Sequence, residues 1–203
     1  MRKKPKNNTR GNAAAGFTVI EMMVAVALFA VVMVISAGAL LALASANRKA
    51  QALQSVMNNL NITLDSMVRS MRGGSRYDCQ PAGAGVVPGR AHDCPTGDTQ
   101  LAFEPHGGNP ATPDQRVYAF IAPSGSQSGY IQRSLDGGTT WTRVTAPEVS
   151  IVDMKFYVVG TTPGDTVQPK VVVEVKGVAG ANNARITTTF HIQATAVQRI
   201  LDL

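Results

Sequence analysis

The sequence is poor in charged residues, and the shortage is concentrated in one stretch. Asp, Glu, Lys and Arg make up 16% of its 203 residues, against roughly 25% in a typical soluble domain. Between Phe17 and Ala46, Glu21 is the only charged residue in thirty positions. An apolar run of at least ~18 residues has the length of a membrane-spanning helix. This stretch therefore argues against a wholly soluble cytoplasmic protein.

The first sixteen residues lack acidic residues altogether. They carry five of the chain's 19 basic residues, namely Arg2, Lys3, Lys4, Lys6 and Arg10. Without these five, the net charge of +6 falls to +1, so the basic character belongs to this leader. Lys and Arg beside an apolar span hold that flank in the cytoplasm. The charge pattern thus predicts that the chain points outward from Phe17, and it disfavours nucleic acid as a partner.

Cysteine is scarce, with only Cys79 and Cys94, both beyond the apolar run. An isolated pair outside the cytoplasm is typical of a disulfide. A loop of this size contributes roughly 3 kcal/mol to stability. A metal site would have to recruit His92 and Asp93 beside Cys94, but no ligand spacing recurs in the sequence. We expect a disulfide and no metal.

The order of segments at the N-terminus differs from that of a secretory signal. Such a signal has a short apolar core of ~7–15 residues followed by a small-residue cleavage site. Here the small residues 13–16 come before the apolar run, which is about twice as long as that core. Cleavage after Gly16 would keep the helix and leave Phe17 as a new N-terminus at the cytoplasmic face.

The segment Gly16-Phe17-Thr18-Val19-Ile20-Glu21, with its basic leader and long apolar run, resembles the type IV prepilin family. That family has glycine before the cut, phenylalanine after it, and then Thr-Leu-Ile-Glu, so only Val19 departs from the pattern. The resemblance covers residues 1 to about 72. It implies cleavage between Gly16 and Phe17 by prepilin peptidase, N-methylation of Phe17 and assembly with other pilin or pseudopilin subunits. It also implies a single-pass inner-membrane protein with a cytoplasmic N-terminus, whose head is periplasmic or extracellular before it joins a filament.

Glu21 has a physical interpretation that does not depend on the family. A carboxylate inside hydrocarbon is costly unless it is paired. The freed amine of Phe17 on an adjacent subunit is a natural partner, and that pair would fix the axial register between subunits. The alternative is that Glu21 simply extends toward the cytoplasmic headgroups.

The helix is predicted to continue beyond the membrane, from Phe17 to Arg72. Apolar residues recur at steps of three and four, which places them on one helical stripe: Leu53, Val56, Met57, Leu60, Leu64, Met67, Val68 and Met71. Gly73-Gly74 ends the pattern. Gly38 either weakens the helix or permits close packing of a neighbouring helix.

The rest of the chain is predicted to form an antiparallel β-sheet head, which gives an α+β class. We expect an irregular loop over 73–98, a hairpin turn at Asp136-Gly137-Gly138, and strands at 100–104, 116–122, 129–135, 139–145, 149–159, 170–176 and 184–197. Four segments follow: a cleaved leader (1–16), a transmembrane or filament-core helix (17–46), an amphipathic continuation (47–72) and an extracytoplasmic head (73–203) with the disulfide loop 79–94.

No constellation of side chains predicts catalysis. His92, His106 and His191 fall in two loops and a strand, and Asp93, Asp98 and Asp114 are scattered through loops, where we expect them to be solvated. We therefore predict a structural protein that is not an enzyme and has no cofactor. The order of parts in the head is similar to J-type pseudopilins and W-type minor pilins. The alternative is a membrane-anchored binding domain, for a surface, a carbohydrate or DNA, that does not polymerise.

Overall fold

The computed structural model describes residues 16–162, 167–179 and 187–199. The leader up to residue 15 lies outside these ranges, as do residues 184–186 of the strand expected at 184–197. By its internal packing the chain divides into two units, Met1–Ala44 and Ser45–Leu203.

One helix, α1, spans Val19–Arg72 and runs unbroken through Gly38. It matches the predicted helix to within two residues at its start. At its other end the Gly74 amide donates to the carbonyl of Met71 at 2.8 Å. A side chain at Gly74 would collide with the ring of Phe103 and the carbonyl of Glu104. Glycine is therefore required where the helix ends and the chain enters the first strand.

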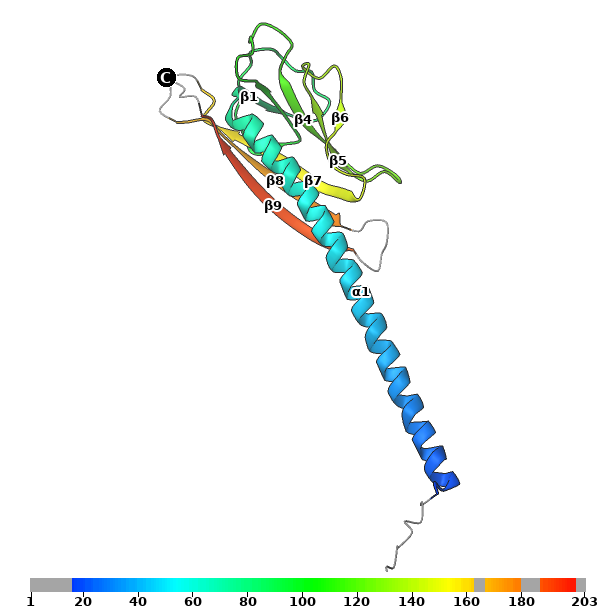
Figure 1. Cartoon of the computed structure of the whole chain (residues 1–203). Helices are drawn as coiled ribbons and strands as arrows, with labels where there is room; N and C mark the ends of the chain where they lie inside the picture. The colour runs from blue at the N-terminus through cyan, green and yellow to red at the C-terminus, as the bar shows by residue number, and fades with distance from the viewer. Residues whose placement is uncertain (1–15, 163–166, 180–186, 200–203) are drawn as a thin grey trace, which may run out of the picture. The chain divides into compact units, whose positions relative to one another are not determined.

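Two antiparallel sheets follow the helix (Figure 1). The first has the order β1-β3-β4-β5-β6, with strands Ser75–Gln80, Gln100–Glu104, Arg116–Ile121, Tyr130–Ser134 and Thr142–Arg143, which are β1, β3, β4, β5 and β6. The second has the order β2-β7-β8-β9, with strands Cys94–Asp98, Val149–Val159, Lys170–Ala179 and Thr188–Val197, which are β2, β7, β8 and β9. One helix followed by antiparallel sheets confirms the α+β class.

The expected strands at 100–104 and 149–159 are confirmed with the same bounds. Three expectations are wrong. The head was expected to be one antiparallel sheet but has two. The expected strand over 139–145 is reduced to the two residues of β6, and the expected loop over 73–98 contains β1 and β2. Neither β1 nor β2 has a run of apolar residues: β1 includes the buried polar residues Asp78 and Gln80, and β2 contains Pro95 and Gly97.

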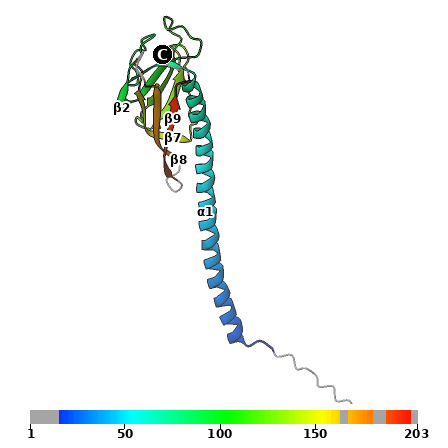
Figure 2. The ribbon, with the colours of Figure 1, turned by 90° about the vertical axis from the view of Figure 1, so that its left-hand side faces the viewer.

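A single hydrophobic core joins the two sheets to the C-terminal half of α1 (Figures 1 and 2). From the helix it takes Val56, Leu60, Leu64, Met67 and Met71, and Leu53 and Val68 pack at its edge. From the sheets it takes residues such as Leu101, Phe103, Tyr118, Ile131, Ile151, Phe156 and Val173. The predicted stripe is thus the face that packs on the sheets.

Candidate processing and assembly segment

The helix starts directly after the Gly16–Phe17 junction, and Thr18 caps it. The Thr18 Oγ1 atom accepts a hydrogen bond from the Glu21 amide at 3.3 Å, and the Thr18 carbonyl accepts one from Met22 at 3.2 Å. An N-cap hydroxyl satisfies one of the amides that lack a partner in the first helical turn. This role of Thr18 was not predicted from the sequence, although Thr-x-x-Glu is the sequence signature of a capping box.

Glu21 therefore lies in the first turn of α1, where the helix dipole favours a negative charge. Its side chain is exposed. Within the described ranges none of the ion pairs involves Glu21. The pairing of Glu21 with the Phe17 amine of another subunit stays a prediction.

The first half of α1 exposes apolar side chains on all sides. Phe17, Ile20, Leu28, Val34 and Leu41 are each more than 60% exposed. The helix is long and apolar enough to cross a membrane, with a mean hydropathy of 2.7 over its most apolar window. A continuous apolar surface of this extent marks contact with lipid or with other proteins.

Comparison with known families gives one finding for this segment. Residues 11–37 match the family model described as the prokaryotic N-terminal methylation motif. This match supports a type IV pilin-like prepilin. Comparison with curated proteins and with solved structures found no significant match.

The motif and the fold agree with each other. The long N-terminal helix with antiparallel sheets is a pilin-like α+β architecture, and the matched residues include the junction, Glu21 and the first part of the apolar helix. A motif of this kind implies a structural protein and not an enzyme. The combination fits a membrane-anchored pilin or pseudopilin subunit.

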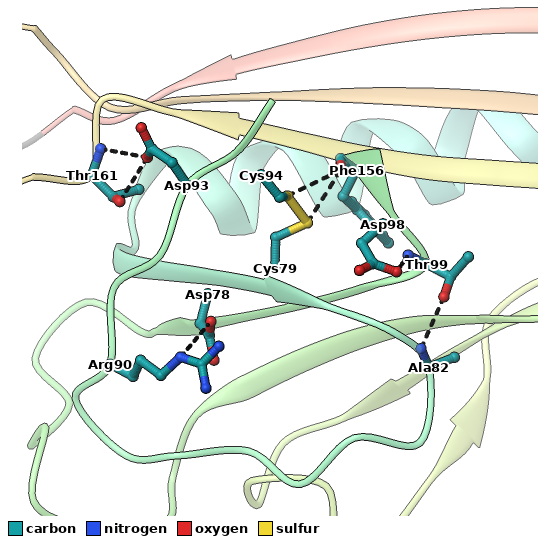
Figure 3. The surroundings of a disulfide bond; sticks show 10 residues. All are labelled: Asp78, Cys79, Ala82, Arg90, Asp93, Cys94, Asp98, Thr99, Phe156 and Thr161. Carbon is teal, nitrogen blue, oxygen red and sulfur yellow. Dashed lines mark hydrogen bonds and ion pairs between the residues drawn. A yellow bond between two sulfur atoms is a disulfide. The ribbon is translucent and has the colours of Figure 1, made fainter. Parts of the chain in front are cut away.

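The disulfide expected between Cys79 and Cys94 is present, and it joins the two sheets (Figure 3). Cys79 belongs to β1 of the first sheet and Cys94 begins β2 of the second. Both sulfur atoms lie close to the Phe156 carbonyl oxygen of β7, at 3.2 and 3.4 Å. A disulfide sulfur has no hydrogen to donate, so these are packing contacts.

The segment between the two cysteines is held by carboxylates at both ends (Figure 3). Arg90 Nε lies 3.1 Å from a carboxylate oxygen of the buried Asp78. Burial raises the pKa of Asp78, although the positive charge of Arg90 opposes that shift. Asp93 accepts hydrogen bonds from the Gly160 amide and from the amide and hydroxyl of Thr161. Burial acts to raise the pKa of Asp93, but these hydrogen bonds outweigh it and the pKa is lowered.

The structure does not bring the three histidines together. His92 and His106 are exposed in loops, and His191 lies 2.7 Å from Glu174 on the outer face of the second sheet. Asp93, Asp98 and Asp114 are half-buried, and each accepts at least one hydrogen bond from the chain; Asp98 lies in β2 and not in a loop as expected. Within the ranges that the structure describes, no group of three His, Cys, Asp or Glu side chains could hold a metal.

Proposed function

We propose that this chain is a minor structural subunit of a type IV pilus or a type II secretion pseudopilus. Prepilin peptidase cleaves it between Gly16 and Phe17, the Phe17 amine is methylated, and the subunit joins a filament through its N-terminal helix. The observation that carries the proposal is the methylation motif at 11–37, together with the exposed apolar helix that begins within it. The minor role rests on the order of parts in the head, which resembles J-type and W-type members.

The proposed orientation follows from charge. The basic leader faces the cytoplasm, and the unit Ser45–Leu203 lies outside it. Cleavage then frees a positively charged amine at the membrane edge, four residues from Glu21. An unpaired carboxylate costs about 2.5–3.5 kcal/mol at the centre of a membrane helix on insertion scales, and less near its end, where Glu21 lies. Pairing Glu21 with the Phe17 amine of a neighbouring subunit removes that cost only in one axial register.

A second candidate function is a membrane-anchored binding domain that does not polymerise. It is favoured by a groove of about 450 Å³ lined by Trp141, Tyr130, Gln127, Gln132 and Arg143, among others. Trp141 is 37% exposed, and the guanidinium of Arg143 lies 4.8 Å from the ring centre of Tyr130. An exposed aromatic side chain beside amide side chains is suited to a carbohydrate. The aromatic ring offers an apolar surface, and the amides can donate and accept hydrogen bonds with hydroxyl groups.

One experiment on the Glu21→Leu variant tests the first proposal against the second. The variant is expressed in cells with and without prepilin peptidase, and its intact mass and its presence in purified filaments are measured. We expect a mass that has lost residues 1–16 and gained one methyl, only where the peptidase is present, and absence from filaments. The matched control is Glu148→Leu, which changes an exposed acid in the head and should assemble normally.

Two outcomes would contradict the proposal. A full leader retained in both strains would show that the chain is not a peptidase substrate and would leave the anchored binding domain. Normal entry of Glu21→Leu into filaments would show that Glu21 only caps the helix dipole and does not set the register.

A further inference from the structure

Two arginines of the first sheet point to the same side as the core. Arg133 of β5 pairs directly with Tyr118 of β4, and directly opposed residues lie on the same face of a sheet. Arg116 precedes Tyr118 by two positions, so it shares that face as well. Tyr118 is only 2% exposed and belongs to the core. Arg116 and Arg133 are half-buried at the margin of this core.

These arginines line a depression of about 340 Å³ beside the C-terminal end of α1. The helix contributes Arg69 and the hydroxyls of Ser66 and Ser70, and His106 follows β3. All the residues that line it belong to the unit Ser45–Leu203, and none of them is acidic. We call this depression the arginine pocket.

The positive charge in the arginine pocket is not balanced by a buried acid. Arg116 donates to the neutral Ser70 hydroxyl at 2.7 Å. Arg69 pairs with Asp65, but the two side chains are 81% and 70% exposed, and such a surface pair contributes little. The Nε of Arg133 is buried and has no hydrogen-bond partner among the residues that the structure describes. The Arg133 guanidinium is therefore not fully satisfied by the described part of this chain.

We propose that the arginine pocket binds a phosphate group, either as free phosphate or as a lipid headgroup. The planar guanidinium fork matches phosphate oxygens two at a time. A phosphate dianion would balance the positive charges of Arg116 and Arg133 together. The serine hydroxyls supply two further donors.

The size and composition of the pocket favour a small ligand. Its volume lies at the low end of the ~300–1,000 Å³ of small-molecule sites. Its one aromatic residue, Tyr118, is buried. Proteins that bind single-stranded nucleic acid stack bases on accessible aromatic side chains. The arginine pocket therefore suits a single phosphate group better than a nucleic acid.

The test is isothermal titration calorimetry of the full chain in a neutral detergent, with inorganic phosphate as the probe and chloride holding the ionic strength constant. We expect Arg133→Gln to weaken phosphate binding roughly tenfold or more, since a charge-assisted hydrogen bond is lost. Arg133→Lys should fall between this variant and the wild type, because it keeps the charge and loses the fork. The matched control is Lys170→Gln, which removes one exposed cation at the start of β8 and should bind like the wild type.

The source of the phosphate group is resolved by a second pair of probes, water-soluble dihexanoyl phosphatidic acid and dihexanoyl phosphatidylcholine. Binding of phosphatidic acid without binding of inorganic phosphate supports a lipid headgroup, and binding of both supports recognition of the phosphate alone.

Failure of both to bind would overturn the proposal. Equal weakening by Arg133→Gln and Lys170→Gln would also overturn it, because the effect would then be one of net charge. The thermal midpoint of each variant, followed through the fluorescence of the only tryptophan, Trp141, shows that it is folded.

Discussion

Glu104 is an acid placed where a neutral side chain would fit better. It lies in β3 and is only 4% exposed. Gln115 donates to its Oε2 atom at 3.0 Å. Burial raises the pKa of Glu104, and the nearby carboxylate of Asp114 raises it further. The hydrogen bond from Gln115 lowers this pKa but does not cancel the increase. The folded state thus holds the proton of Glu104 more tightly than the unfolded chain does.

The consequence is a pH-dependent stability that Glu104→Gln should remove. A group whose pKa is raised in the folded state contributes to the free energy of unfolding. This contribution is fully present at pH values below the unfolded pKa of ~4.3, and it is lost as the pH rises through the folded pKa. We expect Glu104→Gln, which mimics the protonated acid, to raise the thermal midpoint at pH 7 by roughly 2–4 °C, the shift that about 1 kcal/mol produces. At pH 4 the two proteins should converge.

Asp136 provides a control of opposite sign. Hydrogen bonds from the side chains of Ser134 and Thr140 lower the pKa of Asp136 to about 2. A lowered pKa stabilises the fold above the unfolded value of ~3.9, and this contribution is lost as the pH falls toward 2. Asp136→Asn should therefore lower the midpoint at pH 7. A lowered midpoint for Glu104→Gln as well would contradict the burial argument.

At the scale of elements, β2 is poorly secured by its own pairing. It is matched to β7 only at Cys94 and Asp98, with an irregularity between them. Pro95 has no amide hydrogen to donate, and Gly97 has a positive φ of 77° and lies against the ring of Tyr157. The disulfide from Cys94 to β1 is thus the covalent tie between this strand and the first sheet.

Removal of this tie should destabilise the unit Ser45–Leu203. For the double variant Cys79→Ala/Cys94→Ala we expect a loss of roughly 3 kcal/mol and a lower thermal midpoint, measured by Trp141 fluorescence with the full chain in detergent. Reduction of the wild type should give the same midpoint as the double variant, and reductant should leave the double variant unchanged. An unaltered midpoint after complete reduction would mean that β2 is held without the disulfide.

The elements that the sequence predicts are those with a clear period. The helical stripe of α1 and the alternating residues of β7 specify both an element and its buried face. By contrast, β1 is only six residues long and its last four residues, including the polar Asp78 and Gln80, are all buried, so polarity does not indicate which face of β1 is buried. Alternation also gives the face of a strand but not its neighbours, so the division into two sheets could not be predicted.

The same distinction applies to the sites. The segment from Gly16 to Glu21 is continuous in the chain, so its spacing can be recognised directly. The arginine pocket combines Arg69, Arg116 and Arg133 from three different elements. These residues share a site only through the pairing of β4 with β5 and the packing of α1 on that sheet, neither of which is encoded in local spacing.

At the scale of the whole molecule, α1 is one helix in two environments. Up to Ala44 its large apolar side chains are exposed, as a lipid-facing or partner-facing segment requires. From Ser45 onward one apolar stripe is buried in the core, and Ile62 is the one large apolar residue that is exposed among the described residues of this half. The first half therefore depends on lipid or on other chains for its apolar contacts, whereas the second half contributes to the stability of this chain alone.

Leucines in the two halves should consequently differ in their effect on unfolding. Leu60 is completely buried, and we expect Leu60→Ala to lower the stability of the unit Ser45–Leu203 by about 2–5 kcal/mol. Leu41 is 73% exposed, and Leu41→Ala should leave the midpoint reported by Trp141 unchanged in detergent. Both variants remove the same atoms, so the comparison isolates the environment. A similar loss from both would mean that the core of this unit depends on the exposed half of α1 as well, which the packing of the described residues argues against.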